Sequence, residues 1–448
     1  MRLAPLLIRD QGKILNATKT INVGLMGLGV VGGGVASVLM STKDDLFRNL
    51  GCFIQLKKAL IRDPNKQRSV LLPPGVATTD PREILDDPEV DIVVEVMGGE
   101  EPAGSYLKTA INQGKHVVTA NKELISKEGP DLMGLAANLG VNLLFEASVG
   151  GGIPVVGPLM RDLLGNEIRS VHAIINGTTN YILTRMAKDE MAFDKALEEA
   201  QQLGYAEADP TNDVQGIDAA YKLAILATLA FHRRVYPRDI YTEGISNLKI
   251  QDFRHALQLG YAIKLLAIAR QDKNKLEVRV HPAFVPLDHM LANVDGAYNA
   301  VEVEGSLVGR VVLHGQGAGR DPTTSAVVGD VVEIAHRIMS GGKPPRLHAL
   351  ESNAVVKPIA SLTSKYYLRL NVADRPGVLS KIAKVLGDLN ISIDSVIQKG
   401  ADPIKHTAEM VITTHPSEEA AVQESLNQLK GLDVVMEMNS LIRIEDYH

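Results

Sequence analysis

The feature that most constrains the fold is a regular alternation of apolar and amphipathic segments over residues 21–148. Short apolar runs of strand length are separated by stretches in which apolar residues recur at helical spacing. Because right-handed crossovers place the connecting helices on both faces, this pattern predicts a parallel sheet that is buried on both sides. The expected strands are Ile21–Met26, Phe53–Ile61, Asp91–Met97, His116–Thr119 and Asn142–Glu146, and the clearest helices are Val31–Leu39, Pro102–Gln113 and Pro130–Leu139.

Two further regions follow this alternating part of the chain. Residues 154–340 mix long helical stretches with apparent strands, which is typical of an α+β domain. The Gly/Pro-rich run Gly341–Pro345 indicates a linker, and Tyr366–His448 then has the order strand, helix, strand, strand, helix, strand of a ferredoxin-like domain. In the α+β region we expect helices at Pro154–Leu164, Asn180–Lys188, Phe193–Leu203 and Asp218–Arg233, and strands at Val278–Ala283 and Ala300–Leu313.

These patterns predict an α/β protein with three domains. A Rossmann-type doubly wound domain should occupy residues 17–150, and a central α+β domain should occupy residues 151–318. A linker over residues 341–364 should lead to a separable C-terminal domain over residues 365–448.

The composition limits the classes of partner. The 448 residues include 47 Lys and Arg against 53 Asp and Glu, a net charge of −6, which argues against nucleic acid. The single cysteine, Cys52, excludes a disulfide framework and a cysteine zinc site. No apolar run reaches the ~18 residues of a membrane span, and the apolar stretch Leu3–Ile8 is too short for a signal peptide. We therefore expect a cytoplasmic protein that binds neither a membrane nor nucleic acid.

A glycine-rich turn joins the first expected strand to the first helix. It reads Gly27-Leu28-Gly29-Val30-Val31-Gly32. In this pattern one glycine makes the tight turn, one lets the backbone approach a pyrophosphate, and one lets helix and strand pack closely. The free N–H groups at the helix start then bind the phosphates. The position between a strand and a helix favours a dinucleotide site over a turn whose glycines serve packing alone.

The end of the second strand indicates which dinucleotide binds. Arg62 precedes Asp63 there, and Lys66 and Arg68 follow. An acidic residue at this position suits the 2′-hydroxyl of NAD, whereas an arginine suits the 2′-phosphate of NADP. Both cofactors are compatible with this sequence because Arg62 and Asp63 are adjacent, and the nearby Lys66 and Arg68 favour NADP. For Arg68 the simpler interpretation is a charged loop residue.

Two lysines occupy positions that a surface charge does not explain. Lys122 follows the apolar strand His116–Thr119, at the end of a parallel strand where ligands bind. Lys222 lies four residues after Asp218, so the two share a helix face and can pair. Because that helix continues apolar, we expect Lys222 to transfer a proton or to hold a polar substrate. The alternatives are that Lys122 is a charged residue at the edge of a loop and that Lys222 forms an ordinary helix ion pair with Asp218.

An acidic loop precedes this helix and carries the strongest resemblance to a known family. Its carboxylates, Glu207, Asp209 and Asp213, suit a substrate with an ammonium group. The whole stretch Ala200–Lys222 resembles the corresponding loop of homoserine dehydrogenases at every motif position. The resemblance covers nearly the whole chain and includes Gly27–Gly32, Thr119–Lys122, Phe145–Pro154, Asn176–Ile182, Gly315–Gly319 and Gly329-Asp330.

The resemblance implies a reaction and a set of roles. The reaction is the reversible, NAD(P)-dependent interconversion of L-homoserine and L-aspartate 4-semialdehyde, in threonine, methionine and isoleucine biosynthesis. Lys222 would exchange a proton with the C4 oxygen, Asp218 would orient it, and Lys122 would contact both substrate and cofactor. Glu207 would bind the substrate's amino group. The residues implied for the cofactor are Gly27, Gly29, Val30, Val31, Gly32, Arg62, Lys66, Gly98, Lys122 and Gly319.

The resemblance also implies an assembly and an ion site. A helix over residues 319–340 would return to the first domain, and the central domain would bind substrate and mediate formation of a homodimer or homotetramer. Similar enzymes bind a monovalent cation, Na⁺ for example, at the turn Glu146–Pro154. The implied ligands are Glu146 and the carbonyl groups of Val149, Gly151 and Ile153, and the alternative is a plain hinge.

The C-terminal region resembles an ACT domain, the amino-acid-sensing module of many biosynthetic enzymes. Asp374-Arg375-Pro376-Gly377 joins its first strand to its first helix, where Asp caps and Gly permits close approach. In long homoserine dehydrogenases such a domain mediates inhibition by threonine, which would implicate Asp374, Gly377, Asn390 and Gln398. The alternative is a dimerising module without a ligand.

Two other functions compete with this interpretation. One is an oxidoreductase for another amino-acid semialdehyde, and the other is a catalytically silent amino-acid sensor. The complete set of Lys122, Glu207, Asp218 and Lys222 argues against the silent sensor.

Overall fold

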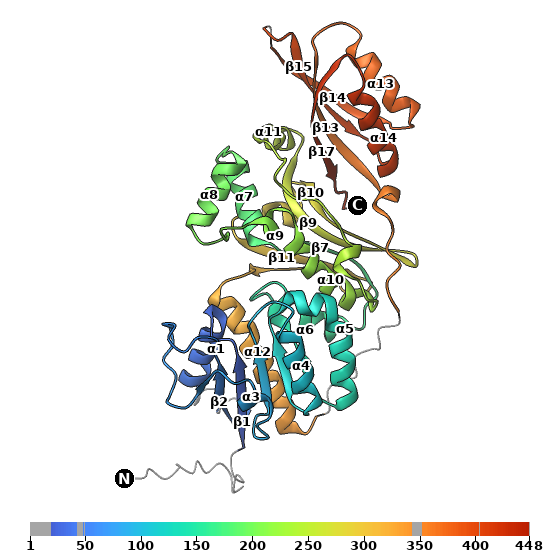
Figure 1. The fold of residues 1–448 in the computed structure, drawn as a ribbon. Coiled ribbons are helices and arrows are strands. Elements are labelled where there is room, and N and C mark those ends of the chain that lie inside the picture. Colours follow the sequence, from blue (N-terminus) through green and yellow to red (C-terminus); the bar gives the residue numbers. More distant parts are fainter. Residues whose placement is uncertain (1–18, 43–47, 49, 343–351, 403, 448) are drawn as a thin grey trace, which may run out of the picture. The chain divides into compact units, whose positions relative to one another are not determined.

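The computed structural model describes residues 19–42, 48, 50–342, 352–402 and 404–447 (Figure 1). The chain forms two compact units. Unit 1 comprises residues up to 121, 131–145 and 324–347, and unit 2 comprises residues 122–130, 146–323 and those from 348 onward. The stretch Leu3–Ile8 and residues 343–351 of the expected linker lie outside the described residues.

Unit 1 is built on a six-stranded parallel sheet with the order β3-β2-β1-β4-β5-β6. The chain moves outward to β3 and then continues on the other side of β1, which is the Rossmann arrangement predicted from the sequence. Helices cover the sheet, so that Ile21, Val23 and Leu25 of β1 are fully buried. The strands are β1 (Thr20–Met26), β2 (Phe53–Leu60), β3 (Ala77–Thr78), β4 (Ile92–Glu95), β5 (His116–Thr119) and β6 (Leu143–Leu144).

Helices from distant parts of the sequence complete unit 1. They include α1 (Val30–Ser41), α3 (Arg82–Leu85), α4 (Ala103–Asn112) and α12 (Arg320–Ser340). The orange α12 of Figure 1 belongs with the blue elements of this unit. It packs tightly against α1, because a side chain at Gly34 would overlap the hydroxyl of Thr324.

Two predicted helices had wrong boundaries. The helix expected at Pro154–Leu164 is shorter and spans only Val156–Met160. The helix expected at Pro130–Leu139 begins at Lys122, so that α5 spans Lys122–Leu139 with Pro130 inside it. Proline is favoured at the first turn of a helix, which made Pro130 a plausible start. Burial of Leu124 and Ile125 favours the earlier start, because their packing stabilises the turns that precede the proline.

Unit 2 contains one large mixed sheet. Its main path runs β12-β11-β7-β9-β10-β17-β13-β15-β14, and β8 and β16 pair at its side. The segment Ala300–Leu313, expected as one strand, is the antiparallel pair β11 and β12. The strands are β7 (Ile168–Ile174), β8 (Tyr241–Thr242), β9 (Tyr261–Asp272), β10 (Lys275–Pro286), β11 (Tyr298–Gly305), β12 (Gly309–Gln316), β13 (Thr363–Ala373), β14 (Ile393–Asp402), β15 (Thr407–Thr414), β16 (Ser417–Glu418) and β17 (Val435–Ile444).

The helices of unit 2 include α10 (Ile217–Phe231), which is the apolar helix with Asp218 and Lys222, and α8 (Phe193–Gln202) and α9 (Thr211–Val214), between which the acidic loop lies. Unit 2 also contains α6 (Val156–Met160), α7 (Gly177–Lys188), α11 (Ile250–Gln258), α13 (Val378–Asp388) and α14 (Glu419–Lys430). In the described part of the chain, no helix is long and apolar enough to cross a membrane.

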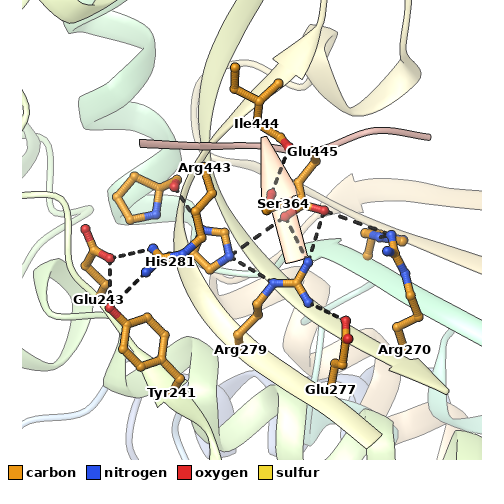
Figure 2. A network of polar contacts seen from close by, with 12 residues as sticks. Tyr241, Glu243, Arg270, Glu277, Arg279, His281, Ser364, Arg443, Ile444 and Glu445 are labelled. Carbon is orange, nitrogen blue, oxygen red and sulfur yellow. Dashed lines mark hydrogen bonds and ion pairs between the residues drawn. The ribbon is translucent and has the colours of Figure 1, made fainter. Parts of the chain in front are cut away.

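The C-terminal domain has the predicted ferredoxin-like order and its own core, which includes Tyr366, Leu370 and Ile382. Its last strand also extends the sheet of the central domain, because β17 pairs with β10 at Ala283↔Arg443 and Phe284↔Ile444. Figure 2 shows the buried charges at this junction. Arg279 of β10 bonds both carboxylate oxygens of Glu445, at 3.0 and 3.1 Å. The domain is thus joined to the rest of unit 2 by strand pairing and buried ion pairs as well as by the linker.

Candidate active site

Three residues predicted to be catalytic come together in unit 2. Asp218 and Lys222 lie one turn apart on α10, and Lys122 is the first residue of α5. The Asp218 carboxylate accepts a hydrogen bond from Lys222 Nζ at 2.7 Å through Oδ2 and forms an ion pair with Lys122 through Oδ1. Asp218 and Lys222 are buried, whereas 44% of the Lys122 side chain is exposed. One carboxylate therefore holds two ammonium groups.

The two lysines differ in their electrostatic environment. Burial lowers the pKa of Lys222, and the nearby charge of Lys122 adds to this effect against the opposing charge of Asp218. Burial also disfavours the charge on Lys122, but the carboxylates of Asp218, Asp213 and Glu207 outweigh it and raise the pKa of Lys122. Burial opposes ionisation of Asp218, yet the two lysines hold its pKa below the usual range. The pKa values of the two lysines are thus shifted in opposite directions, down for Lys222 and up for Lys122.

Backbone geometry fixes the Lys222 ammonium group. Its Nζ also donates to the carbonyl of Ile175 at 2.8 Å, directly after β7. An ammonium group has three N–H donors. The bonds to Asp218 and Ile175 use two of these donors.

Asn176 and Asp213 complete the cluster; the sequence pattern indicated Asp213 as one of the loop carboxylates but did not single out Asn176 as a site residue. Asn176, the N-cap of α7, donates to Asp213 at 2.7 Å and to Asp218 at 2.8 Å. Burial and the neighbouring charge of Asp218 raise the pKa of Asp213. The only signals in the sequence were the position of Asn176 after an apolar run and the acidic density around Asp213.

The other acidic residues of the loop have different environments. Glu207 is exposed, and its charge acts on Lys122. Asp209 accepts hydrogen bonds from the backbone N–H and the hydroxyl of Thr211, at 3.1 and 2.6 Å, and so initiates α9. Glu207 is therefore available to a ligand, whereas Asp209 has a structural role.

The glycine-rich turn of unit 1 has the shape that a pyrophosphate requires. Gly27 has φ +99°, which only glycine adopts readily, and a side chain at Gly32 would overlap the carbonyl of Gly27. Gly29 is the N-cap of α1, has no side-chain cap and has open space at its Cβ position. The N–H groups at the start of α1, around Val30 and Val31, are thus left for an anionic ligand.

The loop after β4 is held by a buried carboxylate. Glu95 accepts hydrogen bonds from the N–H groups of Met97 and Gly98, at 2.7 and 3.2 Å. The hydroxyl of Thr119 also donates to it, at 2.6 Å. Gly98 has φ +74° and open space at its Cβ position, which permits close approach of a ligand.

The cationic residues after β2 differ in whether their side chains are bonded within the loop or exposed. Arg68 donates to the carbonyl groups of Asp63 and Lys66, at 2.6 and 2.7 Å, and thereby holds the loop together. Arg62 and Lys66 are exposed. These two side chains are the ones available to bind a phosphate.

The turn proposed for a cation has a clear structural role. The Glu146 carboxylate accepts hydrogen bonds from the N–H groups of Val155, Val156 and Gly157, at 2.6–2.8 Å, and so caps α6. Gly151, with φ +57°, packs against Gly317, so closely that a side chain would overlap the backbone there. Among the described residues, no group of three or more His, Cys, Asp or Glu side chains could hold a metal ion. Gly319, with φ +112°, precedes α12.

The residues implied for an effector do not form one group within this chain. Gly377 is the N-cap of α13, with φ +89°, whereas Asn390 lies just beyond its other end, with φ +58°. An 11-residue helix is roughly 16 Å long, so these two residues cannot contact one amino acid. Gln398 lies on the edge strand β14, and Asp374 precedes Gly377 in the exposed turn.

Comparisons with known proteins decide the family. Residues 154–332 match the model of the homoserine dehydrogenase family, residues 27–146 match its NAD binding domain, and residues 366–431 match the ACT domain. A homoserine dehydrogenase from Synechocystis is 44% identical over 95% of this chain and 99% of its own length. The chain belongs to the homoserine dehydrogenase family. A homoserine dehydrogenase from Bacillus subtilis is 41% identical, over 95% of this chain and 99% of its own length.

Solved structures of homoserine dehydrogenases show the same fold. The enzyme from Thiobacillus denitrificans superposes with a TM-score of 0.89 at 43% identity and covers 96% of this chain and 99% of its own. A hyperthermophilic archaeal homoserine dehydrogenase in complex with NADPH reaches a TM-score of 0.61 at 26% identity, over 74% of this chain and 100% of its own. Membership of the homoserine dehydrogenase family makes this chain an oxidoreductase with a nicotinamide-binding domain. The silent sensor is thereby set aside.

Proposed function

We propose that the chain interconverts L-homoserine and L-aspartate 4-semialdehyde with NADP, and that Lys222 transfers the proton. The observation that carries this proposal is the cluster in which the buried pair Asp218 and Lys222 of α10 meets Lys122 at the start of α5. A bound nicotinamide supplies or accepts the hydride. The chain's own residues then have to bind the substrate, orient it and move one proton.

The proton transfer follows from the position of the lysines. In the reducing direction the C4 aldehyde carbon receives a hydride, and negative charge develops on its oxygen. Lys222 gives the proton from its third N–H to this oxygen and becomes a neutral amine, which its buried site favours. Lys122 keeps its charge and stabilises the oxygen electrostatically. In the oxidising direction the neutral Lys222 takes the proton from the homoserine hydroxyl.

Two carboxylates support the binding of an amino acid. We assign Glu207 to the substrate's ammonium group, because it is exposed and its charge reaches the same cluster through Lys122. Asp218 holds both lysines, so it orients the proton donor and does not itself bind the ammonium group.

The assignment of NADP rests on Arg62 and Lys66. Replacing Arg62 by alanine should weaken binding of NADPH about tenfold or more and leave binding of NADH within twofold, because only NADPH has a 2′-phosphate to pair with. Fluorescence titration of the reduced cofactors measures both dissociation constants. Arg68→Ala is the control for loop stability, since Arg68 binds only its own loop in the structure. Equal losses for NADPH and NADH in Arg62→Ala would remove this residue from cofactor selection.

The cation remains a proposal based on the resemblance. The carbonyl groups of Val149, Gly151 and Ile153 would hold Na⁺ together with Glu146. The three N–H groups bound to Glu146 occupy most of the acceptor capacity of its carboxylate, so the carbonyl groups would have to supply most of the ligands. The proton transfer described above assigns no role to this ion.

We also propose threonine, methionine and isoleucine biosynthesis as the pathway, a homodimer or homotetramer as the assembly, and the cytoplasm as the location. The resemblance supports all three. Among the described residues, β12 and β14 are the edge strands of the sheet, and such edges offer additional support for self-association.

Feedback inhibition by threonine is proposed for the C-terminal domain. Because Gly377 and Asn390 lie at opposite ends of α13, one effector site would combine these residues from two copies of the chain. Removing the domain would expose the edge of β10 and leave the buried Arg279 without Glu445, so a point variant is the better test.

Asp374→Ala should reduce inhibition by threonine several-fold, with kcat in the absence of threonine unchanged. The exposed Asp374 lies in the loop where the effector would bind, and a typical coupling of ~1–3 kcal/mol gives a shift of this size. Activity measured against threonine concentration checks this, with the exposed Asp388→Ala as control. A wild-type enzyme that is indifferent to millimolar threonine would contradict the proposed regulation.

A further inference from the structure

The amide of Asn176 connects two carboxylates that come from different segments. Its Nδ2 donates to Oδ1 of Asp213, at the C-terminal end of the acidic loop, and to Oδ2 of Asp218 on α10. The same oxygen of Asp218 accepts the hydrogen bond from Lys222. Both N–H groups of the amide are thus used on acceptors of the proton-transfer cluster.

The orientation of this amide is fixed by its other end. Oδ1 of Asn176 accepts hydrogen bonds from the backbone N–H of Thr179 at 2.8 Å and from its hydroxyl at 3.0 Å. The reversed amide would place its oxygen against two carboxylates and its NH₂ against the N–H of Thr179. Asn176 is buried, so water cannot compensate for such a reversal. The N-cap of α7 therefore aims two donors at Asp213 and Asp218.

Several charged groups surround Lys222, and the uncharged amide of Asn176 lies among them. Lys222 is faced by Asp218 on its own helix, by Lys122 from α5 and by Asp213 from the loop, while Glu207 acts on Lys122. Two carboxylates this close repel each other unless a donor or a cation lies between them. Asn176 supplies that donor without adding a charge.

We propose that Asn176 is a positioning residue for proton transfer, because its amide fixes the Asp218 carboxylate against Lys222 and holds Asp213 in place beside it. The proposal rests on the proposed role of Lys222. It extends that role to a residue that need not contact either substrate or cofactor.

Two variants separate positioning from helix capping. Serine is also a good N-cap, so Asn176→Ser keeps an acceptor for Thr179 and removes both amide N–H donors, which reach the carboxylates from a longer side chain than serine has. Asn176→Asp keeps the shape and the cap and adds a carboxyl group beside Lys222. The matched control is Asn180→Ser, because Asn180 lies one turn further on α7, is equally buried and bonds only the carbonyl groups of Val294, Gly296 and Tyr298 through its NH₂.

The readout is the pH dependence of kcat for homoserine oxidation with the full-length enzyme, together with KM for both substrates and the melting temperature. We expect Asn176→Ser to lower kcat roughly 10- to 100-fold, since small misplacements of catalytic groups have effects of this size. KM for NADP⁺ should stay within twofold. In Asn176→Asp the rise of activity with pH should move to higher pH, because added negative charge favours the protonated Lys222.

A kcat within twofold of wild type in Asn176→Ser would overturn the proposal. It would also fail if Asn180→Ser, at an equal loss of melting temperature, lost as much kcat, because the effect would then be structural. Lys222→Ala is measured in parallel. If Lys222→Ala keeps activity, the proposed function fails; if Lys222→Ala is inactive and Asn176→Ser is unaffected, only the positioning role fails.

Discussion

Lys222→Ala is expected to lower kcat for homoserine oxidation about 10²- to 10⁴-fold, because it removes a positioned general base. The loss should appear in kcat, since the proposed role of Lys222 is to act on the C4 oxygen during hydride transfer and Lys222 is not among the residues assigned to the cofactor. Binding of NADPH, measured by fluorescence titration, should therefore stay within about twofold of wild type. Steady-state rates from the nicotinamide absorbance give kcat directly.

A second buried lysine serves as the control for this experiment. Lys264 on β9 is as buried as Lys222, and its Nζ donates to the carbonyl of Val294 at 2.6 Å. Lys264→Ala removes a buried ammonium group from the same unit but outside the cluster, so it should lower stability without a comparable loss of kcat. A Lys222→Ala enzyme with kcat near wild type, or losses of equal size in both variants, would refute the role of Lys222.

Arg443→Met is expected to lower the free energy of unfolding of unit 2 by about 3–5 kcal/mol, the usual effect of breaking a buried ion pair. Arg443 is fully buried and donates to Glu243 at 2.8 Å (Figure 2). It also donates to Glu419, at 2.7 and 2.8 Å. Without it, Glu419 would stay buried with its charge uncompensated. Burial opposes ionisation of Glu419, and Arg443 is what keeps the pKa of that carboxyl low.

Two further variants test this explanation in thermal and urea unfolding. Glu419→Gln in the Arg443→Met background should recover part of the loss, because it removes the uncompensated charge. Arg375→Met should cost less than about 1 kcal/mol, since the ion pair of Arg375 with Asp433 is exposed. An Arg443→Met protein as stable as Arg375→Met would show that the junction between β17 and β10 does not depend on this network.

The order of the Rossmann sheet could be predicted from the sequence because each strand has a local signature. β1, β2, β4 and β5 are short apolar runs between helical patterns, and their crossovers follow a fixed handedness. In unit 2 the local sequence pattern does not identify the strands as clearly. β9 is a long apolar run that fits a buried helix as well as a strand, and β7 carries the polar Ser170 and His172 in buried positions.

No local sequence pattern predicts that the C-terminal domain is joined to the sheet of the central domain. β17 reads as an ordinary strand of a ferredoxin-like domain, and its pairing with β10 joins residues 160 positions apart, such as Ala283 and Arg443. This pairing explains why Arg279 and Glu445 can be buried, because it brings the two charges together. Non-local strand pairing depends on the tertiary fold, which periodicity does not encode.

The candidate site shows the same division between local and distant contacts. Asp218 and Lys222 are four residues apart on one helix, so their pairing follows from helical spacing. The bonds of Asn176 to Asp213 and Asp218 span 37 and 42 residues and required the fold. The glycine-rich motif likewise did not predict that Glu146 accepts three backbone N–H hydrogen bonds at the start of α6.

The pH dependence of hydride transfer from L-homoserine to NADP⁺ tests the central claim most directly, because only the neutral Lys222 can accept the hydroxyl proton. Initial rates are followed by nicotinamide absorbance in wild type and in Lys222→Ala. The account predicts that the wild-type rate rises with pH through a midpoint below 10.5, the ordinary lysine pKa, since burial lowers the pKa of Lys222. This rise should be absent from the residual rate of Lys222→Ala. No reduction of the cofactor by L-homoserine, or the same rise in both proteins, would contradict it.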